Sequence, residues 1–113
     1  MNLLPEKYRN DEELIRLTVE QIKKDFSVHL PELILSGGKE KLFDELHAQI
    51  SAALTLLRKK NPSAFQSLLY RVDISETIVS KLPSENFCEA LSGKIIQREF
   101  QKVLTRRFFS NKE

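Results

Sequence analysis

Cysteine is nearly absent from this sequence: Cys88 is the only one in 113 residues. A single cysteine cannot form an internal disulfide, and it leaves no cluster of thiolates for a structural zinc site. We expect Cys88 to be a small buried apolar side chain. Glycine and proline are also scarce, with three and four residues, so the segments between them are free to form regular structure.

Long apolar runs are absent as well. No uninterrupted apolar stretch approaches the roughly 20 residues that a membrane-spanning helix needs. The first residues, Met1 to Glu6, lack the basic start and the apolar run of a secretory signal. We therefore expect a cytoplasmic protein that does not insert into a membrane.

The composition is that of a folded domain. Apolar residues make up 41% and charged residues 30% of the chain, which is close to ordinary globular usage and far from that of disordered proteins. A chain of 113 residues can enclose one modest core, whereas two domains of half that size would be too small. The sequence predicts a single helical domain over residues 1–113.

Two long segments near the start show helical periodicity. The first predicted helix begins at Asn10 or Asp11, because Asn10 and Glu13 have the spacing of a reciprocal cap. The second spans about residues 39–60. Their predicted inward-facing side chains are Leu14, Ile15, Thr18, Val19, Ile22 and Phe26, followed by Leu42, Phe43, Leu46, Ile50, Ala53, Leu54 and Leu57. Two leucines, Leu17 and Leu56, fall outside these apolar stripes.

The connection over residues 27–38 has no clear periodicity. Pro31 disfavours helical geometry at Leu30, and Gly37 with Gly38 favours a turn. A loop, a short helix opened by Pro31 and a brief extended piece all fit this segment.

Shorter elements follow residue 60. Asn61 and Pro62 have the order of a cap and a first helical residue, and the helix after them is expected to bury Phe65, Leu68, Leu69 and Val72. Ser75 is a candidate cap for a further short segment that buries Ile78, Val79 and Leu82. The sequence thus predicts an all-α fold, a compact bundle of four or five helices, three long and one or two short.

The last predicted helix, capped by Ser84 and ending near Phe108, carries two apolar faces. One face holds Phe87, Cys88, Leu91 and Ile95, and the other holds Ile96, Phe100, Val103 and Leu104. The two are displaced by more than a third of a turn and therefore need two packing partners. Either the helix breaks near Gly93, or it passes from one packing surface to another. A second subunit could cover one face, so a homodimer is one of the alternatives.

No arrangement of residues indicates catalysis, a cofactor or a metal. His29 and His47 are the only histidines, and Asp44 with His47 is a single approximate copy of a motif that a dimetal site needs twice. We expect His47 to be solvated beside Asp44. Gly37, Gly38 and Lys39 lack the remaining positions of a phosphate-binding P-loop.

Basic residues recur every four positions on the last helix, at Lys94, Arg98, Lys102 and Arg106. They could contact an acidic partner protein, or track phosphates with a salt-dependent affinity. The simpler explanation is a solvated face near a helix C-terminus, where positive charge is favourable.

Three functional hypotheses follow. The first is a non-enzymatic interaction or assembly module, for which a protein partner or self-association is expected rather than nucleic acid. The second is a weak nucleic-acid-binding protein that uses the basic face of the last helix. The third is an enzyme whose site is assembled from scattered polar residues and cannot be recognised in the sequence.

Overall fold

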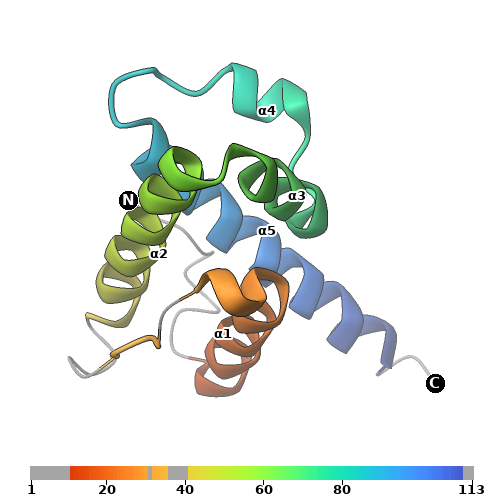
Figure 1. The fold of residues 1–113 in the computed structure, drawn as a ribbon. Coiled ribbons are helices and arrows are strands. Elements are labelled where there is room, and N and C mark those ends of the chain that lie inside the picture. Colours follow the sequence, from red (N-terminus) through yellow and green to blue (C-terminus); the bar gives the residue numbers. More distant parts are fainter. Residues whose placement is uncertain (1–10, 31, 36–40, 111–113) are drawn as a thin grey trace.

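The computed structural model describes residues 11–30, 32–35 and 41–110, and the chain forms helices without any strand in these ranges (Figure 1). The elements are α1 (Glu12–Phe26), the 3₁₀ turn η2 (Ser27–His29), α2 (Leu42–Lys60), α3 (Pro62–Val72), α4 (Glu76–Ser80) and α5 (Phe87–Ser110). The predicted all-α bundle is confirmed, with α1, α2 and α5 as its long helices. None of the described helices is long and apolar enough to cross a membrane.

Helix α1 begins at Glu12, one residue after the later of the two predicted positions, and Asp11 is its N-cap. The Asp11 carboxylate accepts a hydrogen bond from the backbone N–H of Leu14 at 3.1 Å, which caps the helix. Asn10, the alternative cap, lies outside the described residues. The helix ends where Ser27 takes a positive φ of 53°, and the chain turns there into η2.

The connection after η2 is irregular over its described residues. Residues 32–35 form neither helix nor strand, and the side-chain amide of Gln49 on α2 holds the backbone of Ile34. The Ile34 N–H donates to Gln49 Oε1, and Gln49 Nε2 donates to the Ile34 carbonyl, both at 2.8 Å. The predicted turn at Gly37 and Gly38 lies outside the described residues.

The junction of α2 and α3 follows the predicted pattern. The Asn61 side chain accepts a hydrogen bond from the Ala64 N–H at 3.1 Å, and Pro62 is the first helical residue. Because an N-cap amide satisfies a donor that would otherwise have no partner within the helix, Asn61→Ala is expected to lower the free energy of unfolding by about 1 kcal/mol. Urea unfolding followed by circular dichroism measures this loss, and an unchanged midpoint would contradict it.

Helix α4 is capped by Ser75 as predicted, since the Ser75 hydroxyl accepts from the Ile78 N–H at 3.2 Å. The predicted burial of Ile78 is wrong, because this side chain is 40% exposed. A helix of five residues makes little more than one turn and can direct few side chains inward. Val79 and Leu82 pack against the core while remaining partly exposed.

Helix α5 begins later than predicted. Its first residue is Phe87, and Ser84 therefore does not cap it. Asn86 precedes the helix with a positive φ of 59°, a conformation that asparagine tolerates better than most residues, and its carbonyl accepts from the Ala90 N–H.

Gly93 does not interrupt α5, which runs unbroken from Phe87 to Ser110. Gly93 is buried, and the hydroxyl of the preceding Ser92 donates to the His47 carbonyl on α2 at 3.1 Å. Ser92 therefore links α5 to the backbone of α2.

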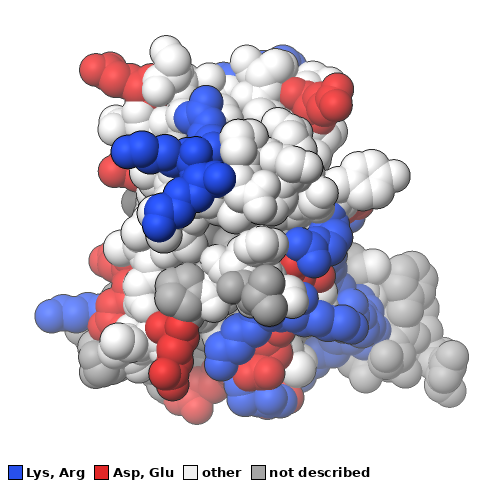
Figure 2. Space-filling model, viewed as in Figure 1, with Lys and Arg blue, Asp and Glu red and all other residues white. Residues whose placement is uncertain are grey.

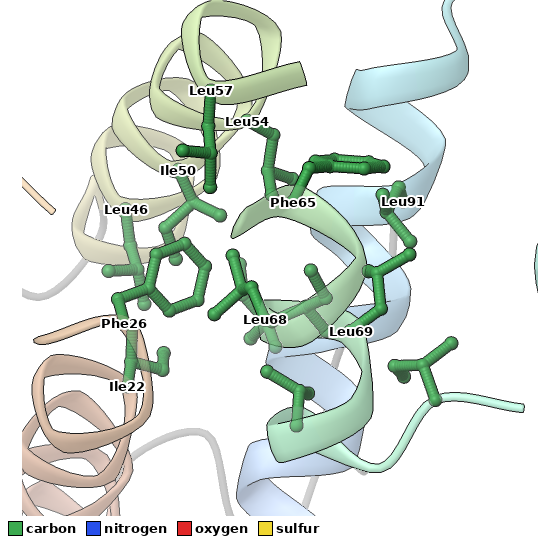
Figure 3. Close-up of a cluster of buried hydrophobic side chains, with 14 of the residues drawn as sticks. Ile22, Phe26, Leu46, Ile50, Leu54, Leu57, Phe65, Leu68, Leu69 and Leu91 are labelled. Carbon is green, nitrogen blue, oxygen red and sulfur yellow. The ribbon is translucent and has the colours of Figure 1, made fainter. Parts of the chain in front are cut away.

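The main core lies where α1, α2, α3 and α5 meet (Figure 3). Phe26 extends from the end of α1 toward Leu46 and Ile50 of α2 and toward Leu68 of α3 (Figure 3). Cys88 is partly buried against this core, close to the expectation from the sequence.

A second, smaller cluster packs α5 against α1. It consists of Leu14, Phe100 and Val103, with Leu17, Phe43 and Leu104 packed around them. Leu91 and Ile95 of the first apolar face lie in the main core. The chain itself therefore covers both apolar faces of α5, and the helix does not need a second subunit to bury either of them.

Candidate functional site

The four basic residues predicted as partner or phosphate contacts have different surroundings. Lys94 and Arg106 are exposed on α5. Arg98 and Lys102 instead contact carboxylates and carbonyls of other helices. The structure therefore does not present the four residues as one free basic face.

Arg98 binds the C-terminal end of α3. Its Nη2 donates to Asp73 Oδ2 at 2.7 Å, and its Nε donates to the Asp73 carbonyl at 3.2 Å. Asp73 has a positive φ of 69° and ends α3, so Arg98 ties this turn to α5. The hydrogen bond and charge of Arg98 lower the pKa of Asp73.

Lys102 is the centre of a buried ionic cluster, which we define as Asp25, Glu99 and Lys102. Its Nζ donates to Asp25 Oδ2 at 2.8 Å and lies 3.0 Å from Glu99 Oε1. It also donates to the Arg71 carbonyl at 3.1 Å. One ammonium group thus links α5 to α1 and α3, and its side chain is only 17% exposed.

Glu99 is the most deeply buried member of this cluster, with an exposed fraction of 0%. Although Lys102 is close, neither carboxyl oxygen of Glu99 accepts a well-oriented hydrogen bond. Burial, assisted by the neighbouring Asp25 carboxylate, raises the pKa of Glu99 to about 8. Glu99 therefore holds its proton at neutral pH, and the neutral carboxyl can donate that proton to Asp25 in a hydrogen bond.

Asp25 stays charged in the same cluster. Burial alone would raise its pKa, but the hydrogen bonds that Asp25 accepts from Lys102 and Gln21, together with the neighbouring Glu99 carboxyl, outweigh burial and hold the pKa below its ordinary value. Gln21 Nε2 donates to Asp25 Oδ1 at 3.2 Å. The cluster therefore combines one ion pair, between Asp25 and Lys102, with one neutral acid.

Glu99 and Asp25 had no assigned role in the sequence analysis, although a signal for Glu99 exists. On a regular helix Glu99 falls between the two apolar faces of α5, with Ile95 and Ile96 before it and Phe100 and Val103 after it. A carboxyl group placed there must be buried when both faces are covered. Asp25 carries no such signal, because its contact with Lys102 spans 77 positions.

A groove of about 510 Å³ lies beside this cluster, between α1 and α5. Its apolar lining residues are Leu17 and Val103, which belong to the second cluster of the core. The groove is bordered by Glu20, Gln21, Lys24, Arg106 and Arg107. Leu17, one of the two leucines outside the predicted stripes, therefore lines a surface groove together with Arg106.

Positive charge dominates the border of this groove. Three cationic side chains face one anionic one, and Lys and Arg side chains gather where α1 and α5 lie, in the lower right of Figure 2. Arg107 lies 3.6 Å from Asp11, and Glu20 lies 3.9 Å from Lys23. Lys24 and Arg106 form no ion pair within the described part of the chain, so their charges face the groove and solvent.

His47 is half-buried and has a contact that the sequence does not reveal. Its Nε2 lies 2.8 Å from the Glu89 carbonyl of α5 at the exposed surface, so His47 joins two helices. Among the residues that the structure describes, no three His, Cys, Asp or Glu side chains are placed to hold a metal ion. Comparison of the chain with protein-family models, curated proteins and solved structures finds no match.

Proposed function

We propose that this protein is a non-enzymatic interaction module whose α1–α5 groove binds an acidic amphipathic helix of a partner protein. The observation that carries the proposal is the meeting of an apolar floor, made by Leu17 and Val103, with the cationic border of Lys24 and Arg106. An amphipathic helix lays its apolar face into such a groove, and acidic residues flanking that face complement the border.

The nucleic-acid hypothesis is less well supported. A phosphate-binding face needs several cations free to replace counterions. Arg98 and Lys102 already donate to Asp73 and Asp25, so half of the predicted contacts are engaged within the chain. The remaining pair, Lys94 and Arg106, is separated by three turns of α5 and makes a sparse phosphate track.

An enzyme that uses the buried ionic cluster is also less well supported. Asp25, Glu99 and Lys102 are titratable groups with shifted pKa values, which is a feature of many active sites. However, none of the three is among the described residues that line the α1–α5 groove, and Glu99 is fully buried. A catalytic acid must reach its substrate, so we assign the cluster a structural role.

Binding of designed peptides tests the proposed function. The probe is a helical peptide of about 18 residues with leucines at i, i+3, i+4 and i+7 and glutamates on both flanks, and a matched peptide carries lysines in place of the glutamates. We expect the acidic peptide to bind preferentially, with an affinity that decreases as salt concentration rises.

Substitutions locate the binding site. Arg106→Glu is expected to weaken binding of the acidic peptide by about tenfold or more, because it reverses a charge on the groove border. Lys94→Glu makes the same change of charge on the same helix outside the groove, and we expect it to alter binding by less than about twofold. Equal effects of the two substitutions, or equal binding of both peptides, would contradict the proposal. Stronger binding to mixed DNA or RNA across a salt series would favour the alternative.

A further inference from the structure

The outer face of α2 is unusual because it carries no acidic or basic side chain over three turns. Residues 46–57 contain no Asp, Glu, Lys or Arg, although Ala48, Ala52, Thr55 and Leu56 are exposed. The exposed face of α1, by contrast, carries Glu12, Glu13, Arg16, Glu20 and Lys24. A helix face that meets only solvent is ordinarily charged, so the face of α2 is suited to contact with protein.

A second groove, of about 400 Å³, opens on this face. Gln49, Ala52, Ala53, Leu56 and Lys60 line it. Leu56, the other leucine outside the predicted stripes, is 53% exposed, and Ile34 is 69% exposed. The two hydrogen bonds between Gln49 and Ile34 fix Ile34 beside α2, so two large apolar side chains stand on the same side of the molecule.

Charges of opposite sign flank the uncharged face. Glu45 lies in the first turn of α2, and Lys59 and Lys60 lie in its last turn. Figure 2 shows Lys and Arg side chains gathered over the upper end of α2. Positions 45, 49, 52, 56 and 59 follow alternating spacings of four and three, so they form one stripe along the helix. The two ends of the stripe, at positions 45 and 59, lie seven residues on either side of Ala52 and are opposite in charge.

We propose that α2 pairs with α2 of a second copy of this chain in an antiparallel arrangement centred on Ala52. In this arrangement Glu45 faces Lys59 of the second copy at each end of the interface, so the same patch is complementary to itself. In the same register Leu56 of the second copy lies opposite Ala48, and Thr55 of the second copy lies opposite Gln49, the residue that holds the exposed Ile34. The interface is separate from the α1–α5 groove, and it does not depend on the peptide-binding proposal.

A charge-swap experiment tests both the association and its direction. Glu45→Lys and Lys59→Glu each place like charges at both ends of the homodimer, whereas a mixture of the two variants restores opposite charges at both ends. Sedimentation equilibrium is run on the full chain from about 10 μM to about 1 mM. We expect the wild type to shift from monomer toward dimer, each variant to stay monomeric, and the equimolar mixture to regain the dimer.

A second pair of variants keeps the test decisive if either charge variant fails to fold, which circular dichroism would reveal. Ala52→Glu places two glutamates against each other at the centre and is expected to abolish the dimer. Ser67→Glu adds the same charge to the exposed surface of α3 and should leave association unchanged. A wild type that remains monomeric at every concentration, a mixture that associates no better than its components, or equal effects of Ala52→Glu and Ser67→Glu would overturn the proposal.

Discussion

We expect the free energy of unfolding of the wild-type protein to decrease as the pH rises from about 5 to about 8, and we expect Glu99→Gln to abolish this decrease. In the folded protein the pKa of Glu99 is about 8, whereas the ordinary value is 4.5. Between these two values the folded state holds a proton that the unfolded chain releases. The free energy of unfolding therefore decreases as the pH rises, by about 1.4 kcal/mol for each pH unit from this group alone.

Glutamine is the appropriate replacement because it is neutral at every pH and close in shape to the protonated acid. Its amide can still donate to Asp25, which keeps its charge through its contact with Lys102. At pH 5 the variant and the wild type should have similar stabilities, since both carry a neutral side chain at position 99. At pH 9 the variant should be more stable by several kcal/mol, because it avoids a buried carboxylate without a well-oriented hydrogen bond.

Urea unfolding monitored by circular dichroism at pH 5, 7 and 9 measures this difference. Glu89→Gln removes an exposed carboxyl group from the same helix and serves as the control for loss of a charge. We expect the Glu89 variant to follow the wild type at each pH. Parallel curves for the Glu99 variant and the wild type across the whole range would show that Glu99 is not held neutral.

Phe26→Ala is expected to lower the free energy of unfolding by about 3–5 kcal/mol. Phe26 is 1% exposed and lies where α1 meets α2 and α3 (Figure 3). Removing its ring forfeits the transfer free energy of the ring and leaves a cavity that three helices cannot all close. The loss is a large part of the roughly 5–15 kcal/mol that stabilises a typical domain.

Two further variants, Phe26→Leu and Leu56→Ala, serve as comparisons for the effect of Phe26→Ala. Phe26→Leu retains much of the buried volume and should cost clearly less than Phe26→Ala. Leu56→Ala removes a side chain that is 53% exposed and should change the free energy of unfolding by less than about 0.5 kcal/mol. Thermal unfolding of the three variants ranks them, and a loss below about 1 kcal/mol for Phe26→Ala would contradict the packing of α1 described above.

The long helices could be predicted because their apolar residues repeat at helical spacing over several turns. Leu46, Ile50 and Leu54 of α2 are buried as this pattern predicts. The N-cap of α3 could also be predicted, since Asn61 followed by Pro62 satisfies local backbone requirements that do not depend on the rest of the fold.

The beginning of α5 and the exposure of Ile78 could not be predicted from local pattern. Serine is a good N-cap in general, but residues 84–86 form a bend and a turn before the helix begins. The positive φ of Asn86 completes this turn, and α5 starts at the next residue. Ile78 belongs to a helix too short to bury more than one side of itself.

Contacts between distant segments account for most of what the sequence did not reveal about the candidate site. The spacing of Lys102 matches that of Lys94 and Arg106 and therefore predicts a solvated or partner-binding face. Its position near Asp25 depends on how α5 crosses α1, and periodicity within one helix carries no information about that crossing. Leu17 and Leu56 fall outside the apolar stripes of their helices, but only the fold places each of them in a groove.

Nuclear magnetic resonance of the ¹⁵N-labelled chain, titrated with the acidic amphipathic peptide, tests the assignment of the α1–α5 groove most directly. The amide signals that shift should cluster on the two sides of the groove, around Leu17 and Lys24 on α1 and around Val103 and Arg106 on α5. Signals around Lys94 should stay in place. Shifts confined to residues 94–98, or the absence of any shift at saturating peptide, would contradict binding in this groove.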